Sequence, residues 1–180
     1  MQIKREEAVM KLLDSYRAFY NIYPAAEAEH KAELSAPPSF VARCDYFEQE
    51  ESYAFFRRAN LWTTKCEEFI YLFSVQRLTA ELWQQCLEFA HTDGMARANI
   101  GSGHMYTYIT PVVICDSCAP EARQALERCS IHKTFLLSFH GWMDVHAAAF
   151  VADTQEIYTN KSGRCVSKVL SQVLFPKNKK

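Results

Sequence analysis

The stretch Gly101-Ser-Gly-His-Met-Tyr-Thr-Tyr-Ile-Thr-Pro-Val-Val-Ile-Cys-Asp-Ser-Cys118 decides the fold, together with the apolar run from Lys133 to Asp153. Both runs are rich in aromatic and β-branched residues, which favour strands. A polar segment that begins at Pro120 separates them, and a proline near the first turn is typical of a helix start. We therefore expect the centre of a sheet between residues 101 and 153.

The second run alternates apolar and polar residues from Thr134 to Phe150. Because 17 residues exceed one ordinary strand, we expect a turn near Gly141 and two antiparallel strands. The alternation places Phe135, Leu137, Phe139, Met143, Val145 and Ala147 on one face, and Ser138, His140, Trp142, Asp144 and His146 on the other.

Further apolar segments on both sides extend this core. Thr79 is suited to cap a helix that Gly94 would end. Pro111 cannot donate to a strand ladder, so we expect an edge position or a bulge there. Residues 52–62 fit a helix and a strand equally well. The other predicted elements are strands at 40–47, 69–75 and 156–159, and helices over 120–129 and after Gly163.

The pattern as a whole predicts an α+β fold with a mixed, largely antiparallel sheet that is flanked by helices. Residues 2–21 read as an N-terminal amphipathic helix, which Tyr23-Pro24 ends. We expect 1–24 to form a helical arm, 25–39 a connector and 40–180 a single α+β domain. The apolar stripe of the arm needs cover, which a second copy of the chain or packing within the same chain could equally provide.

Composition narrows the classes of function. The chain has 180 residues and a net charge of −1, which argues against a general electrostatic grip on nucleic acid without excluding a local one. Neither a signal peptide nor a membrane span is apparent. Seven cysteines, an odd number, favour reduced thiols and a cytoplasmic protein.

The pair Cys115-Asp-Ser-Cys118 lies between a predicted strand and a predicted helix, where helix-start amides can stabilise a thiolate. This position is compatible with a thiol-redox site, although two unrelated cysteines at a strand end are the favoured explanation. The same pair could join a later cysteine and histidine in a zinc site. The four candidate ligands are Cys115, Cys118, Cys129 and His132.

Acidic residues and a lysine on neighbouring strands suggest a second kind of site, a metal-dependent hydrolase or nuclease-like centre. Carboxylates would hold the metal and the lysine would orient water, with histidines nearby. No Asp/Glu-x-Lys motif occurs on a predicted core strand, which weighs against this hypothesis. Its candidate residues are Glu67, Glu68, His104, Asp116, Lys133 and His140.

The favoured hypothesis is a ligand- or partner-binding protein without enzymatic activity. Aromatic residues make up 13% of the chain, which is compatible with a dense core or with an exposed aromatic groove. Nucleophile-elbow, Walker A, zinc-protease and dinucleotide motifs are absent from the sequence. No cofactor is required by the sequence.

Overall fold

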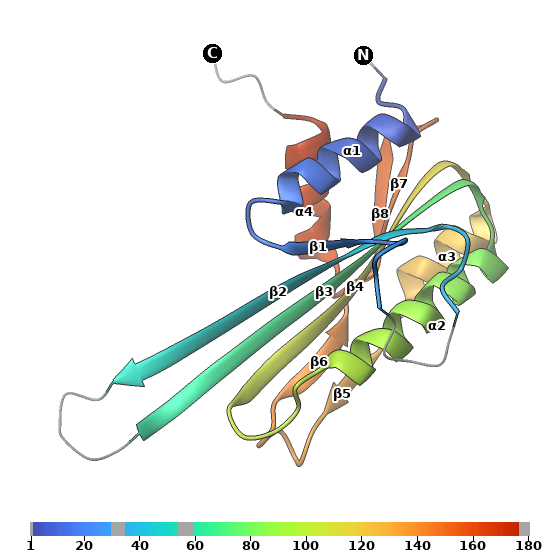
Figure 1. Ribbon diagram of the computed structural model, residues 1–180. Coiled ribbons are helices and arrows are strands. Elements are labelled where there is room, and N and C mark those ends of the chain that lie inside the picture. The colour runs from blue at the N-terminus through green and yellow to red at the C-terminus, as the bar shows by residue number, and fades with distance from the viewer. Residues whose placement is uncertain (1, 30–34, 54–59, 177–180) are drawn as a thin grey trace.

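The computed structural model describes residues 2–29, 35–53 and 60–176, and Figure 1 shows their arrangement. The predicted α+β class is confirmed, because helices flank a mixed sheet. In chain order the elements are α1 (Arg5–Tyr16), β1 (Asn21–Pro24), β2 (Phe40–Tyr53), β3 (Asn60–Leu78), α2 (Ala80–Arg97), β4 (His104–Cys118), α3 (Pro120–Arg128), β5 (His132–Thr134), β6 (Trp142–Val145), β7 (Ala148–Val151), β8 (Glu156–Thr159) and α4 (Arg164–Leu174).

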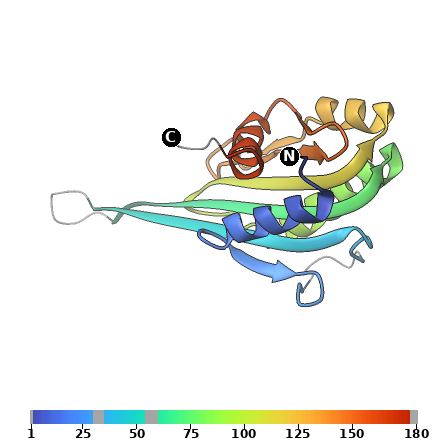
Figure 2. The same cartoon turned by 90° about the horizontal axis from the view of Figure 1, so that it is seen from above.

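The strand order of the sheet is β1-β2-β3-β4-β6-β5, and β7 pairs with β4 and β8. β4 runs parallel to β3, β6 and β7, so the centre of the sheet is parallel and its margins are antiparallel. β2 and β3 extend beyond the other strands (Figures 1 and 2). Residues 54–59 of the ambiguous segment 52–62 lie outside the described residues, and those on either side of them are strand.

Pro111 lies in the middle of the central strand β4, so the prediction of an edge position is wrong. The neighbouring strand accommodates the missing N–H. β6 ends at Val145, opposite Ile109, and β7 begins at Ala148, opposite Val112. β4 pairs with β6 and β7 in the same register, so the interruption leaves only Thr110 and Pro111 of β4 without a paired residue on this side. Pro111 has no N–H to donate to a neighbouring strand, so the gap falls where the ladder would be weakest.

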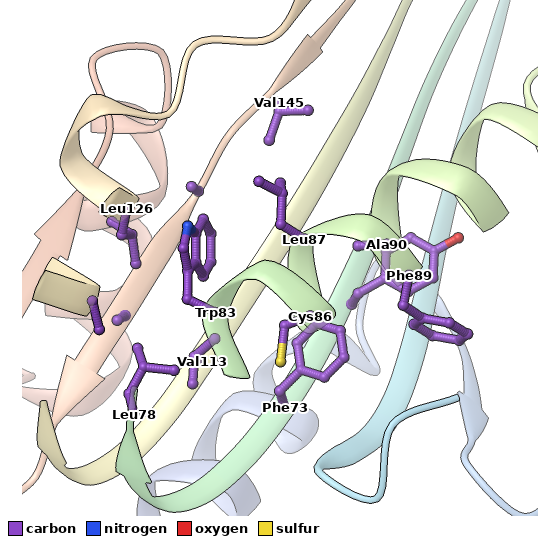
Figure 3. Close-up of a cluster of buried hydrophobic side chains, with 14 of the residues drawn as sticks. Phe73, Leu78, Trp83, Cys86, Leu87, Phe89, Ala90, Val113, Leu126 and Val145 are labelled. Carbon is purple, nitrogen blue, oxygen red and sulfur yellow. The ribbon is translucent and has the colours of Figure 1, made fainter. Parts of the chain in front are cut away.

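Each face of the sheet packs against two helices. On β3, Phe69, Tyr71 and Phe73 face α2 and α3, whereas Ile70 and Leu72 face α1 and α4. All five side chains are buried, because the central strands are covered on both sides. Figure 3 shows the first cluster, in which Trp83 of α2 lies near Val113 of β4. Phe89 of α2 packs against Phe73 of β3.

Helix α1 packs its apolar side chains into the second cluster. Ala8, Leu12 and Tyr16 are buried against β3, β4, β7 and α4. The packing therefore joins the segment 1–24, which we predicted to be an arm, to the predicted domain 40–180 in one hydrophobic cluster. Self-association through α1 stays a prediction. In the described part of the chain no helix has the length and apolarity to cross a membrane.

Only about half of the alternating run from Thr134 to Phe150 forms strands. β5 ends at Thr134, and residues 135–141 form a loop in which Leu137 and Phe139 are 91% and 79% exposed, so the prediction that they lie on one face of a strand with Met143 and Val145 is wrong. The predicted turn at Gly141 is present. Its φ is +67°, and a Cβ there would lie 2.0 Å from the carbonyl oxygen of Met105. Only glycine fits this turn, which breaks the strand.

Helix α2 begins as predicted and ends later. The Thr79 hydroxyl accepts a hydrogen bond from the Leu82 N–H at 3.2 Å, as an N-cap residue does. Gly94 lies inside the helix instead of ending it, and a Cβ there would be 2.9 Å from the Ile109 side chain. The glycine therefore serves close packing of α2 on β4.

A buried network of two arginines and two aspartates ties α2 to β2 and β3. Asp93 accepts hydrogen bonds from the Tyr71 hydroxyl at 2.7 Å and from Arg97 Nε at 2.7 Å. Arg43 donates to Asp45 at 2.8 Å and lies 3.7 Å from Asp93. These charges balance, so the network can be buried without an unpaired ion.

Candidate functional site

Three adjacent strands change from apolar to polar at the same level on the α1/α4 face of the sheet. Along β4, Val112 and Ile114 belong to the core, whereas Thr110, Tyr108 and Tyr106 precede them on the same face. The register places Glu68 of β3 and Asp144 of β6 on either side of Tyr108. We call this surface the aromatic–carboxylate face; it comprises Tyr20, Glu68, Tyr106, Tyr108, Trp142, Asp144 and His146.

Four rings form a continuous column on this face. Tyr106 and Tyr108 stack with centroids 4.3 Å apart, Trp142 lies 5.9 Å from Tyr106, and His146 lies 4.2 Å from Tyr108. Tyr106, Tyr108 and Trp142 are partly exposed, and His146 is buried. Because neighbouring rings occupy most of the ring faces, a ligand would meet the ring edges, the hydroxyl groups and the ends of the column.

The Glu68 carboxylate is half-buried, and the donors that reach it from the described residues are all neutral. The Tyr20 hydroxyl donates to Oε2 at 2.7 Å and the Thr110 hydroxyl donates to Oε1 at 2.9 Å. Tyr20 comes from the chain just after α1 and is fixed by ring contacts with Tyr16 and Tyr46. Within the described residues Glu68 takes part in no ion pair. A half-buried carboxylate without a cation is unusual, because desolvation favours pairing.

The titratable groups around Glu68 do not supply that cation. Burial raises the pKa of the Tyr108 hydroxyl, and Asp144 and Glu68 raise it further, so the phenol stays neutral. Burial lowers the pKa of His146, and the carboxylates of Glu68 and Asp144 oppose this effect only in part. The imidazole is therefore biased toward its neutral form, and the face carries net negative charge.

The predicted pair Glu67 and Glu68 cannot share one metal ion, because adjacent residues of a strand point to opposite faces. Glu67 faces α2, where it accepts hydrogen bonds from the Asn99 side chain at 2.5 Å, the Asn99 N–H at 3.1 Å and the Thr107 hydroxyl at 3.1 Å. Glu68 faces α1.

The structure brings three of the predicted residues together on the α2 face. A hydrogen-bonded chain runs from Glu67 through Thr107 to His104 Nε2, and His104 Nδ1 lies 2.6 Å from the carbonyl oxygen of His140. A carbonyl oxygen only accepts, so Nδ1 carries a proton. His104 is buried, and these hydrogen bonds attach the 135–141 loop to β4 at His140.

The remaining members of the predicted hydrolase or nuclease-like site lie apart, so that hypothesis is wrong in its geometry. Asp116 is nine residues beyond Thr107 on β4, about 30 Å along the strand, and accepts a hydrogen bond from Arg5 at 3.0 Å. Lys133 lies on the edge strand β5 with its amino group 5.6 Å from the Phe135 ring centroid.

The predicted thiol or zinc site is not assembled either. Cys115 points into the core, and burial raises the pKa of its thiol to about 12. Cys118 and Cys129 are half-buried against the same core. His132 is exposed, and its Nδ1 is hydrogen-bonded to Oδ1 of Asp144 at 2.8 Å. Among the described residues no three His, Cys, Asp or Glu side chains are placed to hold a metal ion.

Sequence reasoning missed the tyrosines of the site. Tyr106, Tyr108 and Thr110 alternate with Thr107 and Ile109, and this period of two was the signal that could have placed them on one partly exposed face.

The comparisons with known proteins give a family and no function. A family model described as a domain of unknown function, DUF8052, matches residues 4–172, which run from the start of α1 into α4. No curated protein and no solved structure matches the chain.

Proposed function

For this chain, which belongs to the family of the domain of unknown function DUF8052, we propose that the aromatic–carboxylate face binds a small cationic ligand. The observation that carries the proposal is the Glu68 carboxylate, which is half-buried and held by two neutral hydroxyls without an ion pair among the described residues. An ammonium group would supply the missing positive charge.

The surroundings of Glu68 suit an organic cation. Tyrosine hydroxyl oxygens line the face, and a cation over the ring of Trp142, which is partly exposed at the end of the column, would be attracted by the negative face of that ring. Asp144 offers a second carboxylate on β6, two strands from Glu68 and hence about 10 Å away across the sheet. A ligand with two amino groups could approach both carboxylates.

Thermal unfolding with 1,4-diaminobutane tests the proposal, with 1,4-butanediol as the neutral analogue of similar length. At constant ionic strength and about ten times its Kd, the diamine should raise Tm by roughly 3–6 °C, since it binds the folded chain. Glu68→Gln should abolish the rise.

The matched control is Glu121→Gln, which removes an exposed carboxylate from α3 and should leave the rise intact. Equal effects of the diol and the diamine, or an unchanged response of the Glu68→Gln protein, would show that the face does not recognise a cation.

A further inference from the structure

Cys165 differs from the other six cysteines in its exposure. The thiols of Cys44, Cys66, Cys86 and Cys115 are buried, and those of Cys118 and Cys129 are half-buried. Burial raises the pKa of most of them, to about 11 for Cys86 and about 12 for Cys44 and Cys115. Cys165 is exposed in the first turn of α4. A reagent in solution therefore meets this thiol first.

The thiol of Cys165 has a base beside it. Its sulfur lies 3.7 Å from Nδ1 of His146, within the range of a sulfur hydrogen bond, and also 3.7 Å from the carbonyl oxygen of Ser162. His146 is 7% exposed, and its ring is packed on Tyr108. Among the described residues no hydrogen bond reaches Nε2, so the contact of Nδ1 with Cys165 is the one hydrogen-bonding contact of the imidazole ring there.

Two features of the geometry suit this position to thiol chemistry. Nδ1 of His146 lies within reach of the thiol proton, and Cys165 lies in the first turn of α4, where the backbone amides point toward the helix start. His146 is held in place because Asn160 accepts hydrogen bonds from the Ala147 N–H at 3.0 Å and from the Gly163 N–H at 2.8 Å. The Asn160 side chain thus fixes both the segment between β6 and β7, which carries His146, and the start of α4, which carries Cys165.

We propose that Cys165 is a site of thiol–disulfide exchange with small disulfides, and that His146 accepts its proton. The thiol proton passes to Nδ1 of His146, and the thiolate sulfur attacks one sulfur of the disulfide. The S–S bond of the reagent breaks, a mixed disulfide forms on Cys165, and the leaving thiolate takes up the proton. The disulfide is the oxidant, and one of its halves leaves as a reduced thiol.

The test uses bis(2-hydroxyethyl) disulfide, a neutral probe, so that the outcome is independent of cation binding at the aromatic–carboxylate face. Mass spectrometry of the full-length protein should find the adduct on Cys165 first. Its rate should exceed that of a synthetic peptide spanning residues 161–169 by about tenfold, because the peptide has the cysteine without the histidine.

His146→Gln should remove most of the rate advantage of Cys165 over the peptide, and His91→Gln on α2 should leave that advantage unchanged. Circular dichroism establishes that each variant is folded. A folded protein whose Cys165 reacts no faster than the peptide, or keeps its advantage in His146→Gln, would overturn the proposal.

Discussion

Replacing Asp93 by asparagine is expected to lower the free energy of unfolding by about 3–5 kcal/mol, or Tm by roughly 10 °C. Its side chain is fully buried, and its carboxylate accepts from Tyr71 and Arg97. An asparagine there would leave the guanidinium groups of Arg43 and Arg97 with the single carboxylate of Asp45. An unpaired buried cation costs several kcal/mol, because water no longer solvates it.

Urea unfolding followed by circular dichroism measures this change. Asp14→Asn is the matched control, since the Asp14–Arg17 pair on α1 is about 70% exposed on both sides. Exposed pairs contribute less than about 1 kcal/mol. A loss of under 1 kcal/mol in Asp93→Asn would contradict the assignment of this network as the link between α2 and the sheet.

Asn160→Ala is expected to cost about 3–5 kcal/mol for a different reason. The Asn160 side chain is buried and bonds four backbone groups, namely the N–H groups of Ala147 and Gly163 and the carbonyl oxygens of Val145 and Cys129. Alanine would remove this partner from all four groups, of which the carbonyl oxygen of Val145 keeps a hydrogen bond from the Ser162 hydroxyl at 3.0 Å. Each buried unsatisfied group costs about 1–3 kcal/mol, less whatever water recovers.

Asn21→Ala on the exposed edge strand β1 is the control, and its effect should stay within about 0.5 kcal/mol. Chemical denaturation compares the two variants directly. If Asn160→Ala were as mild as Asn21→Ala, Asn160 would not be the residue that holds the interruption between β6 and β7 against the start of α4.

The sequence predicts the elements of this fold better than their pairing. The α+β class, the Thr79 cap, the turn at Gly141 and the last helix all follow from local chemistry. The position of Pro111 does not, because proline is excluded from a central strand only where a neighbour needs its N–H. Here the neighbouring strand is interrupted at that level, and no local pattern reveals this.

The candidate site was less predictable, because it too depends on contacts between segments that are distant in the sequence. Glu68 was a predicted site residue, but its role was assigned with Glu67, which the strand points to the other face. Cys165 and His146 are 19 residues apart in sequence and meet because Asn160 joins the segment between β6 and β7 to the start of α4. The Cys115 and Cys118 spacing was the stronger local signal, yet burial in the core explains it.

The most direct test of cation binding at the aromatic–carboxylate face is an NMR titration of the full-length protein with 1,4-diaminobutane. Cation binding at this face predicts saturable shifts of the Trp142 indole and of the Tyr108 and His146 rings, while Trp83 in the opposite core stays unchanged. The butanediol analogue should produce none of these shifts. Shifts that are absent, that do not saturate, or that appear equally with the diol would contradict it.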